Sequence, residues 1–195
     1  MKYKTPNSQS EILPNLLGLK SSEDIALSEF EGFLKAEIIL TEKLSSRTRF
    51  DVQYILKIHK LALGHLYSFA GKYRDVNLSK GGFPFAAARF LPETMASFNQ
   101  EILSKLANEY ENSQVLIADI AKVHAEFLFI HPFREGNGRT ARILANLMSR
   151  KQGYDPLLFD KVGKTEFEFY VLAVQLSAEK NYNKMEEFIT SIFPK

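Results

Sequence analysis

The sequence gathers its chemically useful side chains in one segment of twelve residues, HPFREGNGRTAR, which spans residues 131–142. An imidazole such as that of His131 can take a proton from a hydroxyl near neutral pH. Glu135 follows four residues later and offers a carboxylate, which is a usual partner for Mg²⁺ beside phosphate oxygens. A general base next to a metal ligand suits phosphoryl or nucleotidyl transfer to a hydroxyl.

The glycines and arginines of the same segment predict an anion site. Gly136 and Gly138 allow the backbone to turn sharply just before a helix, whose first N–H groups then point at one spot. Arg139 and Arg142 lie three residues apart at the start of that helix, so we expect them to share a face. Cations are unfavourable at the positive end of a helix unless an anion occupies the site. The pattern therefore predicts a bound polyphosphate.

Helical patterns surround the segment and are expected to position it. Apolar residues recur every three or four positions before His131, and Pro132 should end that helix. In contrast, the stretch VNLSKGGFPFA at 76–86 predicts a small β-hairpin turning at Gly81 and Gly82. The predicted fold is mainly α with one hairpin, and the expected helices span residues 22–43, 52–66, 91–110, 115–130, 139–150, 165–177 and 183–192.

The whole chain narrows the class of protein. It has 195 residues, a formal net charge of +2 and no cysteine. This length and composition predict a single domain over 1–195, with an N-terminal extension over about 1–50 and a core over about 51–195. Bulk charge does not favour nucleic acid as a partner, and no apolar run is long enough to predict a membrane span. Without cysteines or an apolar leader, the expected location is cytoplasmic.

The segment resembles the signature of the Fic family, HPFx(D/E)GNGRxxR, at every defined position. A second stretch, YSFAGKYR at 67–74, resembles the family's Y-x-W-A-G-x-x-R, with Phe69 in place of tryptophan. The hairpin falls where the family has its flap. The stretch LPNLLGL at 13–19 is similar to the opening of stand-alone bacterial Fic toxins.

The resemblance implies a Fic-type helical bundle that transfers AMP from Mg-ATP to a Ser, Thr or Tyr hydroxyl of a target protein. His131 would then be the base and Glu135 the Mg²⁺ ligand, with Phe133 packed under the loop. The phosphates would be bound by Gly136, Asn137, Gly138, Arg139 and Arg142, with Arg142 at the γ-phosphate. The target's backbone would be clamped by the flap residues Ser79, Lys80, Gly81, Gly82, Phe83 and Phe85.

Several alternatives stay open at this point. A Doc-like kinase transfers the γ-phosphate, but its motif has lysine where this chain has Gly138. A Fic variant that transfers another phosphate-linked group, or an inactive protein-binding member, also fits the fold. Many Fic enzymes inhibit themselves through (S/T)-x-x-x-E-(G/N), and no copy here is intact, because Leu27 precedes Glu31-Gly32. The chain is therefore expected to be unregulated or to be inhibited by a separate small antitoxin protein.

The other histidines are expected to be structural. His124 lies seven residues before His131 on the same helical face, where packing is the simpler role. His59 and His65 carry no recognisable ligand spacing. A zinc site is disfavoured, because neither cysteines nor closely spaced histidine pairs are present.

Overall fold

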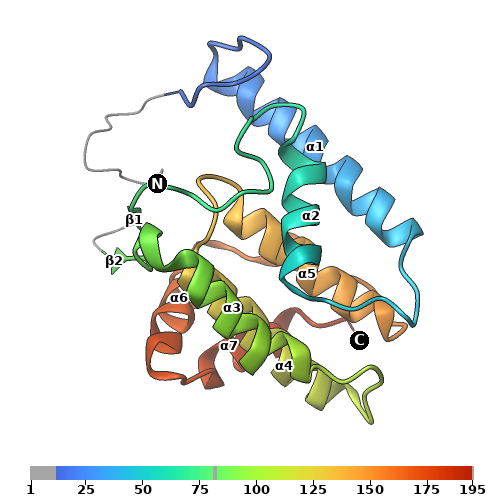
Figure 1. The fold of residues 1–195 in the computed structure, drawn as a ribbon. Coiled ribbons are helices and arrows are strands. Elements are labelled where there is room, and N and C mark those ends of the chain that lie inside the picture. Colours follow the sequence, from blue (N-terminus) through green and yellow to red (C-terminus); the bar gives the residue numbers. More distant parts are fainter. Residues whose placement is uncertain (1–11, 81–82, 195) are drawn as a thin grey trace.

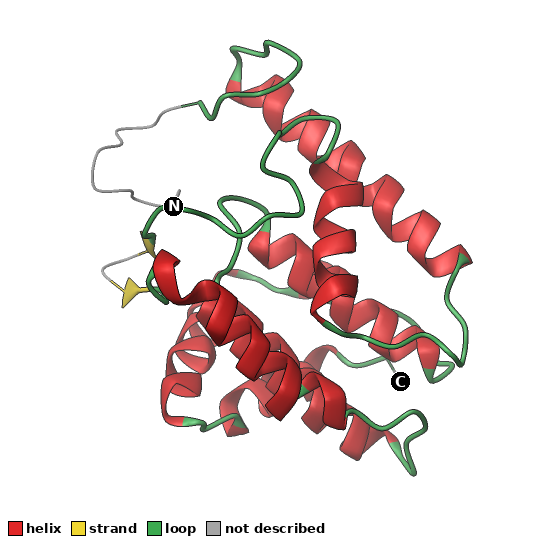
Figure 2. Ribbon diagram, viewed as in Figure 1, coloured by secondary structure: helices red, strands yellow, loops and turns green. Residues whose placement is uncertain are grey.

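The computed structural model describes residues 12–80 and 83–194 (Figure 1). Helices make up most of this part of the chain, as predicted, and the strands form only a small hairpin (Figure 2). The main helices are α1 (Ser22–Glu42), α2 (Val52–Leu63), α3 (Leu91–Glu101), α4 (Ser113–Ile130), α5 (Asn137–Lys151), α6 (Lys164–Leu176) and α7 (Asn183–Ile192), and the strands are β1 (Ser79–Lys80) and β2 (Phe83–Pro84). Short 3₁₀ turns are η1 (Ala88–Phe90), η2 (Leu103–Lys105), η3 (Phe159–Lys161) and η4 (Ser177–Glu179).

Helices α4 and α5 form the centre of the bundle. Helices α1 and α2 pack against each other and against α5, whereas α6 and α7 pack against α4 (Figure 1). Apolar residues bury α4 on nearly all sides, and the residues that predicted it are buried: Leu116, Ile120, Val123, Phe127 and Ile130. The loop 131–136 therefore joins the two most central helices, and a rigid core supports it from both ends.

Side-chain caps explain where several helices begin. Asp51 caps α2 by accepting a hydrogen bond from Tyr54 N at 2.7 Å. Asn112 caps α4 through hydrogen bonds from the N–H groups of Gln114 and Val115. Each cap satisfies a backbone donor that the first turn of a helix leaves without a partner. The caps thus explain why α2 begins at Val52 and α4 at Ser113.

The hairpin is as short as the sequence predicts. Its strands are antiparallel, with Ser79 opposite Pro84 and Lys80 opposite Phe83. The N–H of Phe85 also donates to the carbonyl of Leu78 at 3.1 Å, which extends the pairing by one step. The turn residues Gly81 and Gly82, which were predicted to help clamp the target, lie outside the described residues.

Four helix boundaries differ from the prediction by two residues or more, one of them the start of α4, which lies at Ser113 and not at residue 115. The helix expected over 52–66 ends at Leu63, where Gly64 caps it. The helix expected over 91–110 ends at Glu101, because Ile102 has φ −122° and ψ −64° and leaves the α-helical region. The helix expected from 139 starts at Asn137, because Gly136 takes a left-handed conformation that launches it two residues earlier.

Among the described helices, none is both long and apolar enough to cross a bilayer.

Candidate active site

His131 ends α4 in a conformation that few residues other than glycine adopt. Its φ is 55° and its ψ is 58°, which is the left-handed region. The strain is offset by two backbone hydrogen bonds: the N–H of His131 donates to Phe127 O at 2.9 Å, and its carbonyl accepts from Arg74 Nε at 2.8 Å. In this geometry the imidazole lies between the last turn of α4, through Leu128 O, and the ring of Phe85.

The protonation pattern of His131 follows from its partner. The ring Nδ1 lies 2.9 Å from the carbonyl of Leu128, which can only accept, so Nδ1 carries the hydrogen. In the neutral ring, Nε2 then holds the basic lone pair. The pKa of His131 is lowered to about 3, chiefly by burial and in addition by the charges of Lys80 and Arg74, whereas the hydrogen bond that Nδ1–H donates to the Leu128 carbonyl acts in the opposite direction. The imidazole is therefore neutral at pH 7, as a general base requires.

The flap covers this histidine. The ring of Phe85 lies flat on the imidazole, with centroids 3.9 Å apart and planes 12° apart. Phe83 packs instead against Phe129 of α4, at 5.9 Å between centroids. Phe83 and Phe85, which the resemblance assigned to the clamping of the target, thus pack onto the end of α4 in this structure. His131 retains only 4% of its exposure as a result.

Side chains beneath the loop fix its shape. Asn137 is fully buried and bridges the backbone of Phe133 in both directions, accepting from its N–H at 2.8 Å and donating to its carbonyl at 2.7 Å. Phe133 is also fully buried, as predicted, and stacks on His59 at 3.8 Å. His59 accepts the N–H of Gly71 at Nδ1, so its Nε2 donates to the carbonyl of Glu135 at 3.0 Å. The loop is therefore held by Asn137 at the backbone of Phe133 and by His59 at the carbonyl of Glu135.

The two loop glycines serve different needs. Gly136 has φ 77°, and a Cβ there would lie 2.9 Å from the ring of Phe33, so the fold itself requires glycine. Gly138 has no such need: a Cβ there would meet nothing within 4 Å. Glycine early in a helix lowers stability relative to alanine, so its presence beside open space suits close approach of a ligand to the backbone.

The first turn of α5 points its donors into that space. The N–H groups of Asn137, Gly138 and Arg139 belong to the helix start, where no intrahelical acceptor exists. The N–H of Gly136, which was also predicted to bind phosphate, donates here to Glu135 Oε1 at 2.8 Å. This bond places the carboxylate at the mouth of the anion site.

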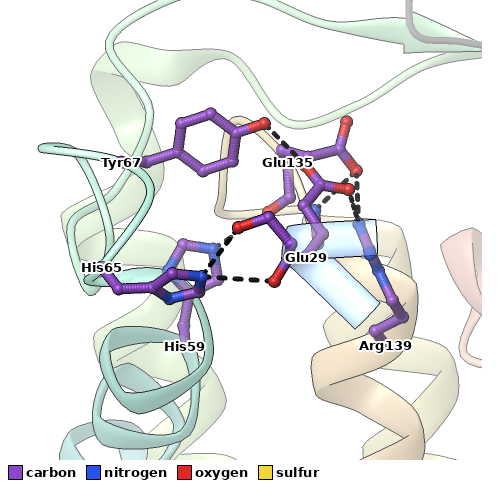
Figure 3. A network of polar contacts seen from close by, with 8 residues as sticks. Glu29, His59, His65, Tyr67, Glu135 and Arg139 are labelled. Carbon is purple, nitrogen blue, oxygen red and sulfur yellow. Dashed lines mark hydrogen bonds and ion pairs between the residues drawn. The ribbon is translucent and has the colours of Figure 1, made fainter. Parts of the chain in front are cut away.

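Arg139 lies between two carboxylates (Figure 3). Its Nη2 is 2.7 Å from Glu29 Oε2 on α1 and 3.5 Å from Glu135 Oε1. Burial raises the pKa of Glu135 above its ordinary value, and the charge of Glu29 raises it further, whereas the N–H of Gly136 and the charge of Arg139 lower it. The other oxygen of Glu29 accepts a hydrogen bond from Tyr67 OH at 2.7 Å.

Arg142 faces a different neighbour. Its guanidinium lies 5.4 Å from the ring of Phe159 in η3, within range of a cation–π contact. The shared face expected from the spacing of three residues thus divides, with Arg139 directed to α1 and Arg142 to η3. Behind Arg142, His124 is buried and its Nε2 lies 2.7 Å from Tyr170 OH, which confirms a packed histidine.

Arg74 joins the flap to the catalytic loop. It is buried, and its backbone N–H donates to Pro132 O at 2.8 Å. Its side chain donates to the carbonyls of His131, Val76 and Ala86, at 2.8, 2.7 and 2.5 Å respectively. A single guanidinium therefore holds the end of α4 and both ends of the hairpin.

Sequence reasoning gave no role to Glu29, Tyr67 or Arg74. A signal for Glu29 was present: it lies on the same helical face as Phe33, Ala36 and Leu40, which are all buried. An acid on an apolar face needs a polar partner, and this one has two.

Metal binding at this site would need help from the nucleotide. Within the described part of the chain, no group of three or more His, Cys, Asp or Glu side chains could hold a metal ion by itself. Glu135 supplies one carboxylate oxygen beside an anion turn, and Mg²⁺ is commonly held by one or two carboxylates together with phosphate oxygens and water. The donor set therefore fits a magnesium ion that arrives with a polyphosphate.

Comparison with known proteins identifies the family of this chain. The model of the Fic/DOC family matches residues 49–149. The protein adenylyltransferase Fic of Nematostella vectensis is 32% identical over 143 residues, covering 72% of this chain and 31% of that protein. The protein adenylyltransferase VbhT of Bartonella schoenbuchensis is 30% identical over 175 residues, covering 85% of this chain and 35% of that protein.

Solved structures share the fold. The N-terminal FIC domain of Bep8 from Bartonella sp. 1-1C superposes with a TM-score of 0.79 at 20% identity, covering 97% of this chain and 94% of that one. BepC from Bartonella tribocorum, solved with bound AMPPNP, gives 0.74 at 19% identity and covers 94% and 93%.

The chain belongs to the Fic/DOC family. Its similarity to the two protein adenylyltransferases spans about a third of their length, 31% and 35%.

Proposed function

We propose that this chain transfers AMP from Mg-ATP to a hydroxyl side chain of a target protein. The observation that carries the proposal is the orientation of His131: its Nδ1–H is bound to Leu128 O, which leaves Nε2 as the basic atom beside the anion turn. The names of the two relatives and the AMPPNP bound to BepC support the same reaction class.

In the proposed reaction, the target hydroxyl gives its proton to His131 Nε2 while its oxygen attacks the α-phosphorus of ATP. The bond between the α-phosphorus and the bridging oxygen to the β-phosphate breaks, and pyrophosphate leaves. The low pKa of His131, about 3, keeps the ring ready to accept at neutral pH. A low pKa also limits its strength as a base, so the proposed reaction requires the pKa of His131 to rise when Mg-ATP and the target bind.

The polyphosphate would occupy the open space in front of Gly138. The N–H groups of the first turn of α5 and the guanidiniums of Arg139 and Arg142 supply the positive potential. Glu135 would hold the magnesium ion, whose charge stabilises the phosphate oxygens during transfer. The chain itself positions the nucleotide through a loop that Asn137 and His59 hold rigid.

Regulation by a separate antitoxin stays a proposal from the incomplete inhibitory motif. Glu31, the acid of that motif, is exposed on α1. The ion pair to Arg139 comes from Glu29 instead, two residues earlier.

The proposed reaction is tested by incubating the purified chain with Mg-ATP and a cell lysate and identifying adducts by mass spectrometry. We expect AMP on Ser, Thr or Tyr residues, and loss of the adduct in His131→Ala with nucleotide binding retained. Removal of a general base typically lowers the rate by about 10²–10⁴-fold. Phosphate adducts would indicate a kinase, and another phosphate-linked group would indicate a different donor. Undiminished transfer by His131→Ala would contradict the assigned base.

A further inference from the structure

Arg139 is shared unequally between its two carboxylates. The distance from Nη2 to Glu29 Oε2 is 2.7 Å, whereas the distance to Glu135 Oε1 is 3.5 Å (Figure 3). Glu135 lies in the loop just before α5, and its carboxylate is only 3.5 Å from the guanidinium, so a small movement would bring the two into a closer pair. The guanidinium of Arg139 is instead directed toward α1, where it also lies 4.6 Å from the ring of Phe33.

Glu29 is built as a fixed anchor. Its side chain is 10% exposed, and each of its two oxygens has a partner, Tyr67 OH on one side and Arg139 on the other. The ring of Tyr67 is buried and stacks on Phe69 at 4.6 Å, so its hydroxyl cannot swing away. A carboxylate held in this way gives a short, charge-assisted bond of fixed direction.

We propose that Glu29, held by Tyr67, is a positioning residue that keeps Arg139 from closing on Glu135 beyond the long 3.5 Å contact, so that the guanidinium can meet phosphate while the carboxylate can meet magnesium. This inference rests on the proposed function. Without Glu29, the nearest anion to Arg139 is Glu135, and the pair would neutralise two groups that the nucleotide and its metal need separately.

The geometry favours positioning over competition with the nucleotide. A guanidinium has five N–H donors in a planar fork, and the contact to Glu29 uses Nη2 alone. The side chain of Arg139 is still 34% exposed, so part of it remains open to a ligand. Glu29 thus restrains the guanidinium without enclosing it.

The test uses Glu29→Ala and Glu29→Gln in the full chain, with Glu31→Ala on the same helix as the matched control. Alanine suits a helix interior, and glutamine keeps the shape while removing the charge. In the crystal structure of each free Glu29 variant, we expect Arg139 Nη2 to close on Glu135 Oε1 to about 2.8 Å, a usual charge-assisted distance. In calorimetry with ATP at increasing Mg²⁺, we expect at least about tenfold weaker binding and a higher Mg²⁺ requirement, since one charge-assisted contact is misplaced.

Glu31→Ala should bind as wild type does, because Glu31 is exposed on α1. Thermal unfolding of each variant checks that the fold persists, and Glu29→Gln retains the test if the alanine variant unfolds. Three results would overturn the inference: Arg139 unmoved in the free variants, Mg-ATP affinity unchanged, or tighter binding, which would make Glu29 a competitor of phosphate. If wild type fails to bind Mg-ATP, the proposed function fails, and the position of Arg139 in the free variants still decides the role of Glu29.

Discussion

The ring of Phe85 lies 3.9 Å from the imidazole of His131 and nearly parallel to it, and so covers one face of the ring whose Nε2 is the proposed base. The hairpin that carries Phe85 is held to the same loop through Arg74. The flap and the base therefore form one local unit, although they are about 50 residues apart in sequence, at positions 85 and 131.

Phe85→Ala should raise the pKa of His131 from about 3 toward the ordinary value of 6.5. Burial is the largest cause of the low pKa, and water admitted by the lost ring favours the charged imidazolium. The charges of Lys80 and Arg74 remain, so the pKa should stay below 6.5. An NMR titration of the ring protons gives the value directly. Phe83→Ala is the control, because Phe83 contacts Phe129; an equal shift in both variants would argue against the covering role.

Gly138→Ala should stabilise the fold slightly and weaken nucleotide binding. Alanine in a helix is favoured over glycine by up to about 1 kcal/mol, and the new methyl group meets no protein atom within 4 Å. The same methyl group would intrude where phosphate is proposed to approach. Thermal unfolding and ATP binding measure the two effects separately.

Gly136→Ala is the matched variant and should behave in the opposite way. Its positive φ and the ring of Phe33 at 2.9 Å make it destabilising before any ligand is added. If the Gly138→Ala protein binds ATP as well as wild type does, Gly138 is not part of the proposed anion site.

Arg74→Lys should loosen the flap and the catalytic loop together. A lysine ammonium is a single point charge and cannot reproduce the planar fork that reaches the carbonyls of His131, Val76 and Ala86. We expect faster amide exchange over residues 76–86 and a larger loss of transfer to the target than of ATP binding. Arg89→Lys is a control at an exposed position next to the hairpin. Unchanged exchange over 76–86 would show that the hairpin does not depend on Arg74.

Acid should destabilise the fold through its buried histidines. Burial lowers the pKa of His124 to about 3, and the charge of Arg142 lowers it further, against one backbone hydrogen bond. Below pH 6.5 the histidine is protonated in the unfolded chain but stays neutral in the folded chain. The contribution of His124 to the free energy of unfolding is therefore fully present above pH 6.5 and is lost as the pH falls toward 3. Between pH 7 and 5 this costs up to about 2 kcal/mol for each such histidine.

Urea unfolding at both pH values measures that loss. His124→Gln should reduce the difference between pH 7 and pH 5. Ile120→Val, a buried change on the same helix, should lower stability by about 1 kcal/mol at both pH values alike. If the free energy of unfolding of His124→Gln falls between pH 7 and pH 5 as much as that of wild type, His124 is not the source of the acid sensitivity.

The sequence predicted the elements whose signals are local. Helix α7 spans Asn183–Ile192, the range its apolar spacing indicated, and the strands fall where the glycine pair predicted a hairpin. The helix expected over 91–110 was too long, because nothing in its spacing announced the break at Ile102. The family and the mainly helical fold were both confirmed. The catalytic and binding roles of the signature residues remain predictions.

Contacts between segments that are distant in the sequence could not be predicted from it. The distance between Glu29 and Arg139 depends on how α1 lies against α5, and spacing along one helix says nothing about that. Likewise, Arg74 was visible as part of a motif, but two of its three carbonyl partners, Ala86 and His131, lie 12 and 57 residues away in the sequence. Periodicity reports which face of a helix is buried, and only packing decides what that face meets.

The hydrogen bonds that attach the hairpin to Arg74 use no side chain of the hairpin, although Phe83 and Phe85 add ring contacts of their own. Arg74 grips the main-chain oxygens of Val76 and Ala86, and every amino acid has such an oxygen. Residues between these two points can therefore be exchanged while their mounting stays the same. A different sequence between the two carbonyls would thus keep the Arg74 hydrogen bonds, provided that it also supplies rings that pack on His131 and Phe129 as Phe85 and Phe83 do.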